Sequence, residues 1–552
     1  MKKNLALLTL GFLIYSNTLK SSFVFDDFET IVNNPAIRHL NLAVLWQAFN
    51  TRFVVGLTLA FNYALGKDHV LGYHVFNTLV HVLNSYLVYS FVCLTYQTPR
   101  MSRHVPTVHA KWLGFLTALV FLTHPLQTQA VTYIWQRATS LAALFYLGAL
   151  VFYIKARLKS SWGYYVLCLL FTVLGMFTKE IVFTLPFAIL LYELIFLEAK
   201  TRKILFFIPL FLTFFIIPWA MTQANEHTLL LLRPVNALRP DFILTELNVL
   251  RTYLRLFILP FHQSVDYNYP RAWSLLEPNT FLSFMTLVGL FSWGVFLLKK
   301  YPLLAFGIFW FFLTVSVEAL AAQGSFLFEH RLYLPLMGLS LFLVTGLSHF
   351  FKKNPRRLTF ILLGIVTAFS LLTYQRNFVW KDAFTLWDNA VREFPHNGRA
   401  YAGRGDALLR NGFSDQALPD LNKAIELEAH HAEAYTNRAL VYQNKNLWEQ
   451  ALADCNKAIQ INPRLVSAYN NRAVAYQKMG LPDKVLEDLS QMIRLEPDNA
   501  NTYNNRGIVF ATKGLFDQAF LDFNKAIELD PNFTNAYNNR AKLKEALGKI
   551  NP

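Results

Sequence analysis

The pattern of apolar and polar residues changes once along the chain, near residue 377. Before that point, apolar residues run in stretches close to the roughly 20 residues that a helix needs to cross a bilayer. After it, apolar residues recur with helical spacing in units of 34 residues. The pattern predicts an all-α protein: a polytopic membrane helix bundle over residues 1–376, followed by an α-solenoid over residues 377–552.

The first part is expected to hold about eleven membrane spans plus interfacial helices. They are predicted near residues 4–20, 74–96, 112–124, 138–155, 162–178, 181–198, 203–221, 279–298, 302–321, 332–350 and 358–376. The segment 243–260 carries Arg251 and Arg255 on one face, so we expect an interfacial or re-entrant helix there. The first segment could be a signal peptide, but an uncleaved span fits better because many spans follow it.

Basic residues gather in every second loop of this predicted bundle. They are Lys2, Lys3, Arg100, Arg103, Lys111, Lys155, Arg157, Lys159, Lys200, Arg202, Lys203, Lys299, Lys300, Lys352, Lys353, Arg356 and Arg357. Basic loops favour the cytoplasmic side. This places the N-terminus in the cytoplasm and the solenoid outside, in the periplasm or a lumen.

Composition supports a membrane protein. The chain is 54% hydrophobic and only 16% charged, where a soluble protein carries about a quarter charged residues. The net charge of +16 could suggest nucleic acid, but basic cytoplasmic loops explain it more simply, so no nucleic acid partner is expected. Cys93, Cys168 and Cys455 lie far apart and are expected to be free.

The second part repeats strictly. An aromatic residue recurs at Tyr401, Tyr435, Tyr469, Tyr503 and Tyr537, with small residues at Gly405, Ala439, Ala473, Gly507 and Ala541 and prolines at Pro463, Pro497 and Pro531. This is the pattern of tetratricopeptide repeats, which have two helices each. We predict a partial repeat at 380–397, repeats at 398–431, 432–465, 466–499 and 500–533, and a capping helix at 534–547.

Two polar rows follow the first helices of these repeats. One row is Asn437, Asn471, Asn505 and Asn539, and the other is Arg404, Arg438, Arg472, Arg506 and Arg540. The asparagine row resembles the ladder that holds extended peptide in the O-linked N-acetylglucosamine transferase, which predicts an acceptor-peptide site. The alternative is that Asn merely suits this helix surface. The arginines are expected to pair with carboxylates of the second helices rather than with a ligand.

The membrane part resembles a known family in several stretches. These are "FVFDDFETIVNNPAI" (23–37), "GYHVFNTLVHVLN" (72–84), "THPLQTQAVTYIWQRATSLAALF" (123–145), "MFTKEIVFTLPFAILLYE" (176–193), "SVDYNYP" (264–270) and "HRLYLPL" (330–336). Together with the repeats, they resemble the C-type membrane glycosyltransferases, specifically the transmembrane tetratricopeptide O-mannosyltransferases and their bacterial relatives. The resemblance implies transfer of a sugar, mannose in those relatives, from a polyprenyl-phosphate lipid to a protein hydroxyl on the outer face. It also implies that the configuration of the sugar inverts.

The resemblance places a catalytic carboxylate in the first outer loop, at Asp26 or Asp27, with a slight preference for Asp27 as the general base. The alternative is that these acids cap a helix. The resemblance places Lys179 near the donor phosphate. The alternative is that Lys179 snorkels to the membrane interface and pairs with Glu180. The further donor-phosphate candidates are Arg331, His330 and Arg137, and other site candidates are Glu180, His124, Glu329 and Asp266.

No nucleotide-binding motif, Ser-His-Asp ordering or metal cluster is visible in the sequence. No cofactor is therefore expected beyond the lipid-linked donor, although a divalent ion on Asp26 or Asp27 stays open. Three other functions stay open as well: an oligosaccharide ligase or polymerase that uses polyprenyl diphosphate, a non-catalytic membrane-anchored scaffold, and a transporter. A transporter fits least, because no charge lies deep in a span. The chain lacks long insertions and has few charges in its loops. This favours a bacterial inner membrane with periplasmic repeats over an endoplasmic reticulum membrane with lumenal repeats.

Overall fold

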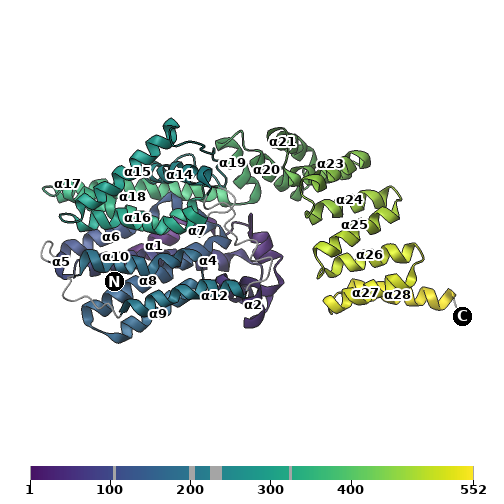
Figure 1. The fold of residues 1–552 in the computed structure, drawn as a ribbon, viewed down its shortest axis with the longest axis horizontal. Helices are drawn as coiled ribbons and strands as arrows, with labels where there is room; N and C mark the ends of the chain where they lie inside the picture. The colour runs from purple at the N-terminus through teal and green to yellow at the C-terminus, as the bar shows by residue number, and fades with distance from the viewer. Residues whose placement is uncertain (1, 103–106, 198–205, 224–238, 322–325, 551–552) are drawn as a thin grey trace. The chain divides into compact units, whose positions relative to one another are not determined.

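The computed structural model describes all residues except 1, 103–106, 198–205, 224–238, 322–325 and 551–552. Every regular element in these described ranges is helical, which confirms the predicted all-α class. The chain forms two compact units, Met1–Asn389 and Ala390–Pro552, here called the membrane unit and the repeat unit (Figure 1). The division falls inside helix α19 (Ala383–Glu393), so the start of the expected partial repeat packs with the membrane unit.

The described helices of the membrane unit follow the apolar stretches of the sequence. They are α1 (Lys2–Ile14), α2 (Leu42–Phe49), α3 (Phe53–Gly66), α4 (Val70–Thr95), α5 (Pro99–Ser102), α6 (Thr107–Thr123), α7 (Thr128–Thr132), α8 (Arg137–Lys159), α9 (Trp162–Met176), α10 (Leu185–Phe196), α11 (Phe207–Leu212), α12 (Ile216–Thr222), α14 (Pro240–Ile258), α15 (Pro278–Leu297), α16 (Pro302–Ala321), α17 (Pro335–Phe350) and α18 (Pro355–Asn377). Short helical turns join them, among them η2 (Phe28–Val32), η4 (Asn50–Arg52), η7 (Glu180–Thr184) and η11 (Glu329–Leu332).

Six described segments are long and apolar enough to cross a membrane: Leu42–Gly66, Val70–Thr95, Ile134–Lys159, Pro278–Leu297, Pro302–Ala319 and Pro355–Trp380. Shorter apolar helices lie at His109–Thr123, Trp162–Met176, Phe207–Thr222 and Pro335–Phe350. These findings support a multi-pass membrane protein. The exact number of crossings stays a prediction, because α1 and α10 have only 13 and 12 residues.

Leu42–Gly66 was not among the expected spans. It is divided by Asn50, whose φ of 42° is unusual for a residue other than glycine, into α2 and α3. One end of α3 is held by the Val54 amide, which donates to the Phe177 carbonyl at 3.0 Å beyond the end of α9. Near the other end, the Asn62 amide donates to the Gly72 carbonyl at the start of α4. The start of α4 and the end of α9 lie at the same end of the helix bundle. Both ends of α3 therefore lie at that end, as expected of an interfacial helix.

Helix α8 lies at the centre of the membrane unit, between α4 and α9 (Figure 1). In the most apolar stretch of Ile134–Lys159, 67% of the residues are buried, against 28% in Pro278–Leu297 and in Pro355–Trp380. A buried polar contact fixes α4 on α8, because the Asn84 amide donates to the Ser140 carbonyl at 2.7 Å. The first turn of α8 is therefore surrounded by other elements on all sides.

Residues beside the predicted basic loops meet at one end of this unit. Lys3 donates to the Lys111 carbonyl at 2.9 Å, and Arg100 donates to the carbonyl oxygens of Ile195 and Leu298 at 2.5 and 2.6 Å. The expected alternation of loops thus agrees with how the helices fold, although the side of the membrane stays a prediction. Of the basic residues used for that prediction, Arg103, Lys200, Arg202 and Lys203 lie outside the described residues.

The segment expected at the interface forms α14, which packs along α15. Asn248 on α14 donates to the Thr280 hydroxyl at 3.0 Å and accepts a hydrogen bond from the Ser283 hydroxyl at 2.6 Å. Helix α14 is not among the segments that are apolar enough to cross a membrane. This agrees with an interfacial helix.

The repeat unit consists of paired helices with the predicted period. They are α20 (Gly398–Arg410), α21 (Ser414–Leu427), α22 (Ala432–Asn444), α23 (Trp448–Ile461), α24 (Val466–Lys478), α25 (Pro482–Leu495), α26 (Ala500–Thr512), α27 (Phe516–Leu529) and α28 (Thr534–Ile550). The turn inside each pair contains one residue with positive φ: Gly412, Asn446, Gly480 or Gly514. Glycine and asparagine adopt this conformation at least cost, which explains why they recur there.

Four of the five arginines of the row pair as expected, whereas Arg540 of α28 donates to the amide oxygen of Asn524 at 2.6 Å instead of to a carboxylate. Arg404, Arg438, Arg472 and Arg506 each bind both carboxylate oxygens of Asp420, Asp454, Asp488 and Asp522 in the second helix of the same repeat, at 2.6 to 3.0 Å. Each arginine also lies over the tyrosine three residues before it. These arginines hold the two helices of a repeat together, so their pairing alternative is confirmed.

Replacing Arg472 with Ala should locally destabilise α24 and α25 by about 2 kcal/mol, because Asp488 would stay buried without its charged partner. Hydrogen exchange of peptides from these two helices measures the local opening free energy. Arg410→Ala is the matched control, since the Arg410–Asp406 pair is mostly exposed and should contribute less than about 0.5 kcal/mol. Equal effects of the two changes would contradict a stabilising role for the arginine row.

Candidate active site

Asp27 is fully buried and ties two loops together. Its Oδ2 accepts from the Val24 amide at 3.1 Å, and its Oδ1 accepts from the Trp135 amide at 2.8 Å. Burial raises its pKa to about 7, although the two amide donors lower it. The side chain makes no capping bond to η2, which starts at the next residue. Asp27 therefore joins the loop after α1 to the loop before α8, rather than capping a helix.

Asp26 differs, because its carboxylate is only partly buried. The Asp26 amide donates to the Tyr133 hydroxyl at 3.1 Å. Burial raises the pKa of the Asp26 carboxyl, while the phenol of Tyr133 lowers it; Glu29 raises it further and Arg52 lowers it. Of the two adjacent acids, Asp26 is the one whose oxygens are not both taken by backbone amides in the folded loop.

Lys179 is buried and faces α16. Its Nζ lies 2.5 Å from Glu318 Oε1 and donates to the Thr139 hydroxyl at 2.9 Å. Arg331 lies on the other side of the same carboxylate, with Nε 3.9 Å from Glu318 Oε2. The alternative in which Lys179 pairs with Glu180 is wrong, since Glu318 takes that place.

Glu180 instead pairs with Arg52, at 3.7 Å between Oε2 and Nη2. Arg52 comes from η4 at the break between α2 and α3, and its guanidinium lies over the Trp135 ring at 5.7 Å. Its charge also lowers the pKa of both Asp26 and His330, although less than the other groups around them affect these pKa values. Arg52 thus adds a third cation beside Lys179 and Arg331.

His330 is buried and stacks on Phe328 with a centroid distance of 5.3 Å. Burial lowers its pKa well below the usual value, and the charges of Lys179, Arg331 and Arg52 lower it further. The ring is therefore neutral, and its Nδ1 is a buried atom without a hydrogen-bond partner. His330 can offer a neutral ring nitrogen to a ligand that reaches these cations.

Two carboxylates of this cluster were missed from the sequence. Glu318 stands near the end of α16, and Glu246 is buried on α14. Burial raises the pKa of Glu246 to about 8, with Arg331 lowering it and Glu318 raising it, so this group is mostly protonated at neutral pH. A lone carboxylate at the end of an apolar run is a functional candidate by default, and this signal was available in the sequence.

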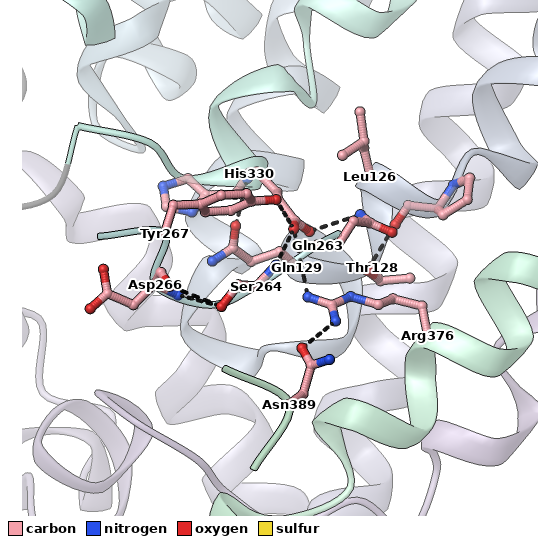
Figure 2. A network of polar contacts seen from close by, with 12 residues as sticks. Leu126, Thr128, Gln129, Gln263, Ser264, Asp266, Tyr267, His330, Arg376 and Asn389 are labelled. Atoms are coloured by element: carbon pink, nitrogen blue, oxygen red, sulfur yellow. Dashed lines mark hydrogen bonds and ion pairs between the residues drawn. The ribbon is translucent and has the colours of Figure 1, made fainter. Parts of the chain in front are cut away.

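Glu329 is the centre of a separate network, and Figure 2 shows its partners Tyr267, Ser264, Gln263 and Arg376. Its Oε1 accepts from the Tyr267 hydroxyl at 2.6 Å and from the Ser264 amide at 3.1 Å, and its Oε2 accepts from Gln263 at 3.0 Å. Arg376 of α18 lies 3.6 Å from the same carboxylate. These contacts hold the 263–267 loop against the end of α18, which is a structural role.

Asp266 belongs to this loop, and Figure 2 shows its carboxylate pointing away from the other labelled residues. The Asp266 amide donates to the Ser264 hydroxyl, and this hydroxyl in turn donates to the Asp266 carbonyl at 2.9 Å. Asp266 is thus part of a tight loop, and the structure does not bring it to the cation cluster.

Arg137 and His124 are also held in structural contacts. Arg137 is fully buried and donates to Asn77, Asn62, Thr58 and the Tyr73 carbonyl, which joins α8 to α3 and α4. The His124 ring accepts from the Leu126 amide and contacts the Phe257 carbonyl at 2.9 Å. We therefore leave both residues out of the proposed site.

The asparagine row lies in the repeat unit and makes contacts between neighbouring repeats. The Asn471 amide donates to the Thr436 carbonyl at 3.2 Å, and the Asn539 amide donates to Asn504 Oδ1 at 2.8 Å. These bonds favour the structural alternative for Asn471 and Asn539. The acceptor-peptide role of the row, Asn437 and Asn505 included, stays a prediction.

An apolar groove of about 470 Å³ runs between α10, α15 and α16. It is lined by Phe187, Leu190, Leu191, Leu194, Phe291, Phe309, Phe312, Leu313 and Ser316. Ser316 precedes Glu318 by two residues on α16, which is about 3 Å along the helix axis, but side chains at this spacing point to different faces of a helix. Among the described residues, no group of three or more His, Cys, Asp or Glu side chains could hold a metal ion.

Comparison with known proteins finds relatives of both the repeats and most of the chain. The tetratricopeptide repeat family model matches residues 432–465 and 500–533. A protein O-mannosyl-transferase of Caenorhabditis elegans is 26% identical over 77% of this chain and 62% of its own length. The chain is similar to protein O-mannosyl-transferases. Protein O-mannosyl-transferase TMTC3 of Mus musculus is 24% identical over 73% of this chain and 49% of its own length.

These relatives confirm the resemblance expected from the sequence, that is, to O-mannosyl-transferases that carry tetratricopeptide repeats. The chain spans about half to three fifths of the length of these relatives. A crystal structure of MamA is also similar, at 25% identity over 27% of this chain and 86% of that chain, with a TM-score of 0.25.

Proposed function

We propose that this protein transfers a sugar, mannose if it acts as its relatives are named, from a polyprenyl-phosphate lipid to a hydroxyl group of a protein. One observation carries the proposal. A partly exposed carboxylate, Asp26, lies at the same end of the bundle as three cations, and an apolar groove ends on α16 at Ser316, two residues before the Glu318 that pairs with two of these cations. A base, a phosphate site and a lipid site are the parts that such a transfer needs.

The groove suits the lipid part of the donor. Its lining is almost entirely apolar, and it follows α16 up to the level of Lys179 and Arg331. A polyprenyl chain in this groove would leave its phosphate next to these cations. Lys and Arg are the usual protein partners of phosphate. The donor thus fits as one molecule that binds at two adjoining surfaces.

In the proposed reaction, the acceptor hydroxyl oxygen forms a bond to the anomeric carbon of the sugar, and Asp26 takes the hydroxyl proton. The bond between the anomeric carbon and the phosphate oxygen breaks, and polyprenyl phosphate leaves. Lys179, Arg331 and Arg52 stabilise the charge that develops on this phosphate. With the base and the leaving group on opposite sides of the sugar, the configuration inverts.

We further propose that the site faces the periplasm of a bacterial inner membrane, opposite the end where Lys3, Lys111 and Arg100 meet. A polyprenyl donor stays in the bilayer, so its sugar must be used at a membrane interface. Basic loops at the other end support this orientation. The repeats would then meet acceptor proteins outside the cytoplasm.

Purified full-length protein in detergent, supplied with radiolabelled polyprenyl-phosphate mannose and an envelope protein extract, tests the proposal. Label is expected in protein and to depend on the lipid donor. If no label reaches protein from this donor or from other polyprenyl-phosphate sugars, the proposal fails and the scaffold alternative gains support.

The rate should also depend on pH through Asp26. Burial raises the pKa of Asp26, and a base works only when deprotonated, so kcat/KM should fall as the pH decreases through this pKa. Tyr133→Phe removes the phenol that lowers the pKa, so the acid limb of the pH profile should move to higher pH. Tyr267→Phe is the control, because that phenol binds Glu329 and should not move the limb. A limb that stays in place in Tyr133→Phe would contradict Asp26 as the base.

A further inference from the structure

The loop that carries Asp26 is fastened to the segment that follows the last helix of the bundle. The Ser22 amide and hydroxyl both donate to the Lys381 carbonyl, at 2.9 and 3.2 Å. Asn17, just before this loop, donates to the Tyr374 carbonyl of α18 at 2.8 Å. All of these residues belong to the membrane unit.

Phe25, directly before Asp26, has an unusual backbone. Its φ is 53°, in the left-handed region that a bulky residue adopts only where its surroundings enforce it. Burial does not supply the enforcement, because Phe25 is 38% exposed. The conformation must therefore be held by specific contacts.

Two ring contacts flank Phe25. Its ring meets Tyr133 edge-on with a centroid distance of 6.1 Å, and meets Trp387 of α19 edge-on at 5.6 Å. Tyr133 in turn stacks on Trp380 at 5.5 Å and 15°. Because the Tyr133 hydroxyl also accepts from the Asp26 amide, aromatic residues contact the backbone directly before this carboxylate.

Trp380 and Trp387 both follow the last helix of the bundle, where the expected partial repeat begins. Tyr133, however, is also kept in place by the buried loop before α8. The backbone of Phe25 lies in a turn in which the Asp27 amide donates to the Val24 carbonyl at 3.1 Å. The contact of the Phe25 ring with Trp387 adds to this turn from another segment of the chain.

We propose that Trp387 is a positioning residue for the transfer, an inference that rests on the proposed function. Trp387 does not need to touch the substrate. Its ring keeps Phe25 at positive φ, and this directs the Asp26 carboxylate toward the acceptor hydroxyl. The first turns of α19 thereby complete the active site, in addition to leading into the repeats.

The test compares kcat and the donor KM of the purified full-length protein and its variants. Trp387→Ala should lower kcat about tenfold, since a small displacement of a catalytic group costs this much or more, with the donor KM unchanged. Trp387→Phe keeps an edge contact and should recover most of the rate. Phe384→Ala, an exposed residue one turn earlier on α19, is the matched control and should behave as wild type.

A second background separates positioning from general damage. Glycine adopts positive φ without strain, so a Phe25→Gly protein no longer needs the ring of Trp387 to hold its backbone. In that background, Trp387→Ala should lower kcat no further. The same tenfold loss in both backgrounds would overturn the inference, and so would a Trp387→Ala protein with the wild-type kcat.

The two proposals can fail separately. If wild-type protein transfers sugar while Trp387→Ala and Phe384→Ala both behave as wild type, only the positioning role is overturned. If wild-type protein transfers no sugar, the proposed function is overturned, and this inference falls with it.

Discussion

Asp26→Asn should lower the rate of sugar transfer about a thousandfold, since a general base contributes between 10² and 10⁴ to such a rate. An amide cannot take the proton of the acceptor hydroxyl, but it is close in shape to the carboxylate. The donor KM should therefore stay near that of wild type. Single-turnover transfer from the radiolabelled lipid measures the loss without interference from product release.

Asp27→Asn is the comparison that separates the two acids. Both oxygens of Asp27 accept from buried backbone amides, so an amide nitrogen there would face the Val24 or Trp135 donor. The expected cost is about 1–3 kcal/mol of stability, seen as a lower melting temperature. If Asp27→Asn instead keeps full stability and loses all activity while Asp26→Asn keeps its rate, the roles assigned to the two acids are reversed.

Lys179→Met should lower kcat/KM for the donor about a hundredfold, because removing one group that stabilises developing charge typically costs 10² to 10³. Lys179 is buried and lies against Glu318, so its charge reaches the phosphate with little screening by water. Inhibition by added polyprenyl phosphate should weaken in parallel. Initial rates at several donor and inhibitor concentrations give both quantities.

Arg157→Met is the control for Lys179→Met. Arg157 forms a similarly buried ion pair with Glu193, at 2.8 Å, but at the end of α8 away from Asp26. Its loss should lower stability without changing the donor KM. If the two variants show the same kinetic change, the effect of Lys179 comes from a broken ion pair rather than from a phosphate site.

The repeats were the part of the structure most open to prediction, because their contacts are local and periodic. Arg404, Arg438, Arg472 and Arg506 each meet an aspartate 16 residues later, and the sequence repeats both residues at steps of 34. The helical class of the membrane unit was equally clear from the long apolar runs. Neither result needs knowledge of how distant segments meet.

The candidate site was only partly open to prediction, because its contacts join distant segments. Lys179 meets Glu318 on another helix, rather than the adjacent Glu180 that the sequence offered. Asp27 binds the backbone of Trp135, a contact that no side-chain pattern reveals. Arg52 became a candidate only through the break at Asn50, since neither residue stands out in the sequence.

The most direct test of the account compares three donors in one assay: polyprenyl-phosphate mannose, a polyprenyl-diphosphate oligosaccharide and a nucleotide-linked mannose. Purified wild-type protein and Asp26→Asn are incubated with each donor and an acceptor protein, and mass spectrometry locates any added sugar. The account predicts a single hexose on Ser or Thr hydroxyls from the first donor alone, nearly absent with Asp26→Asn. Transfer of an intact oligosaccharide from the diphosphate donor, or equal transfer by Asp26→Asn, would contradict it.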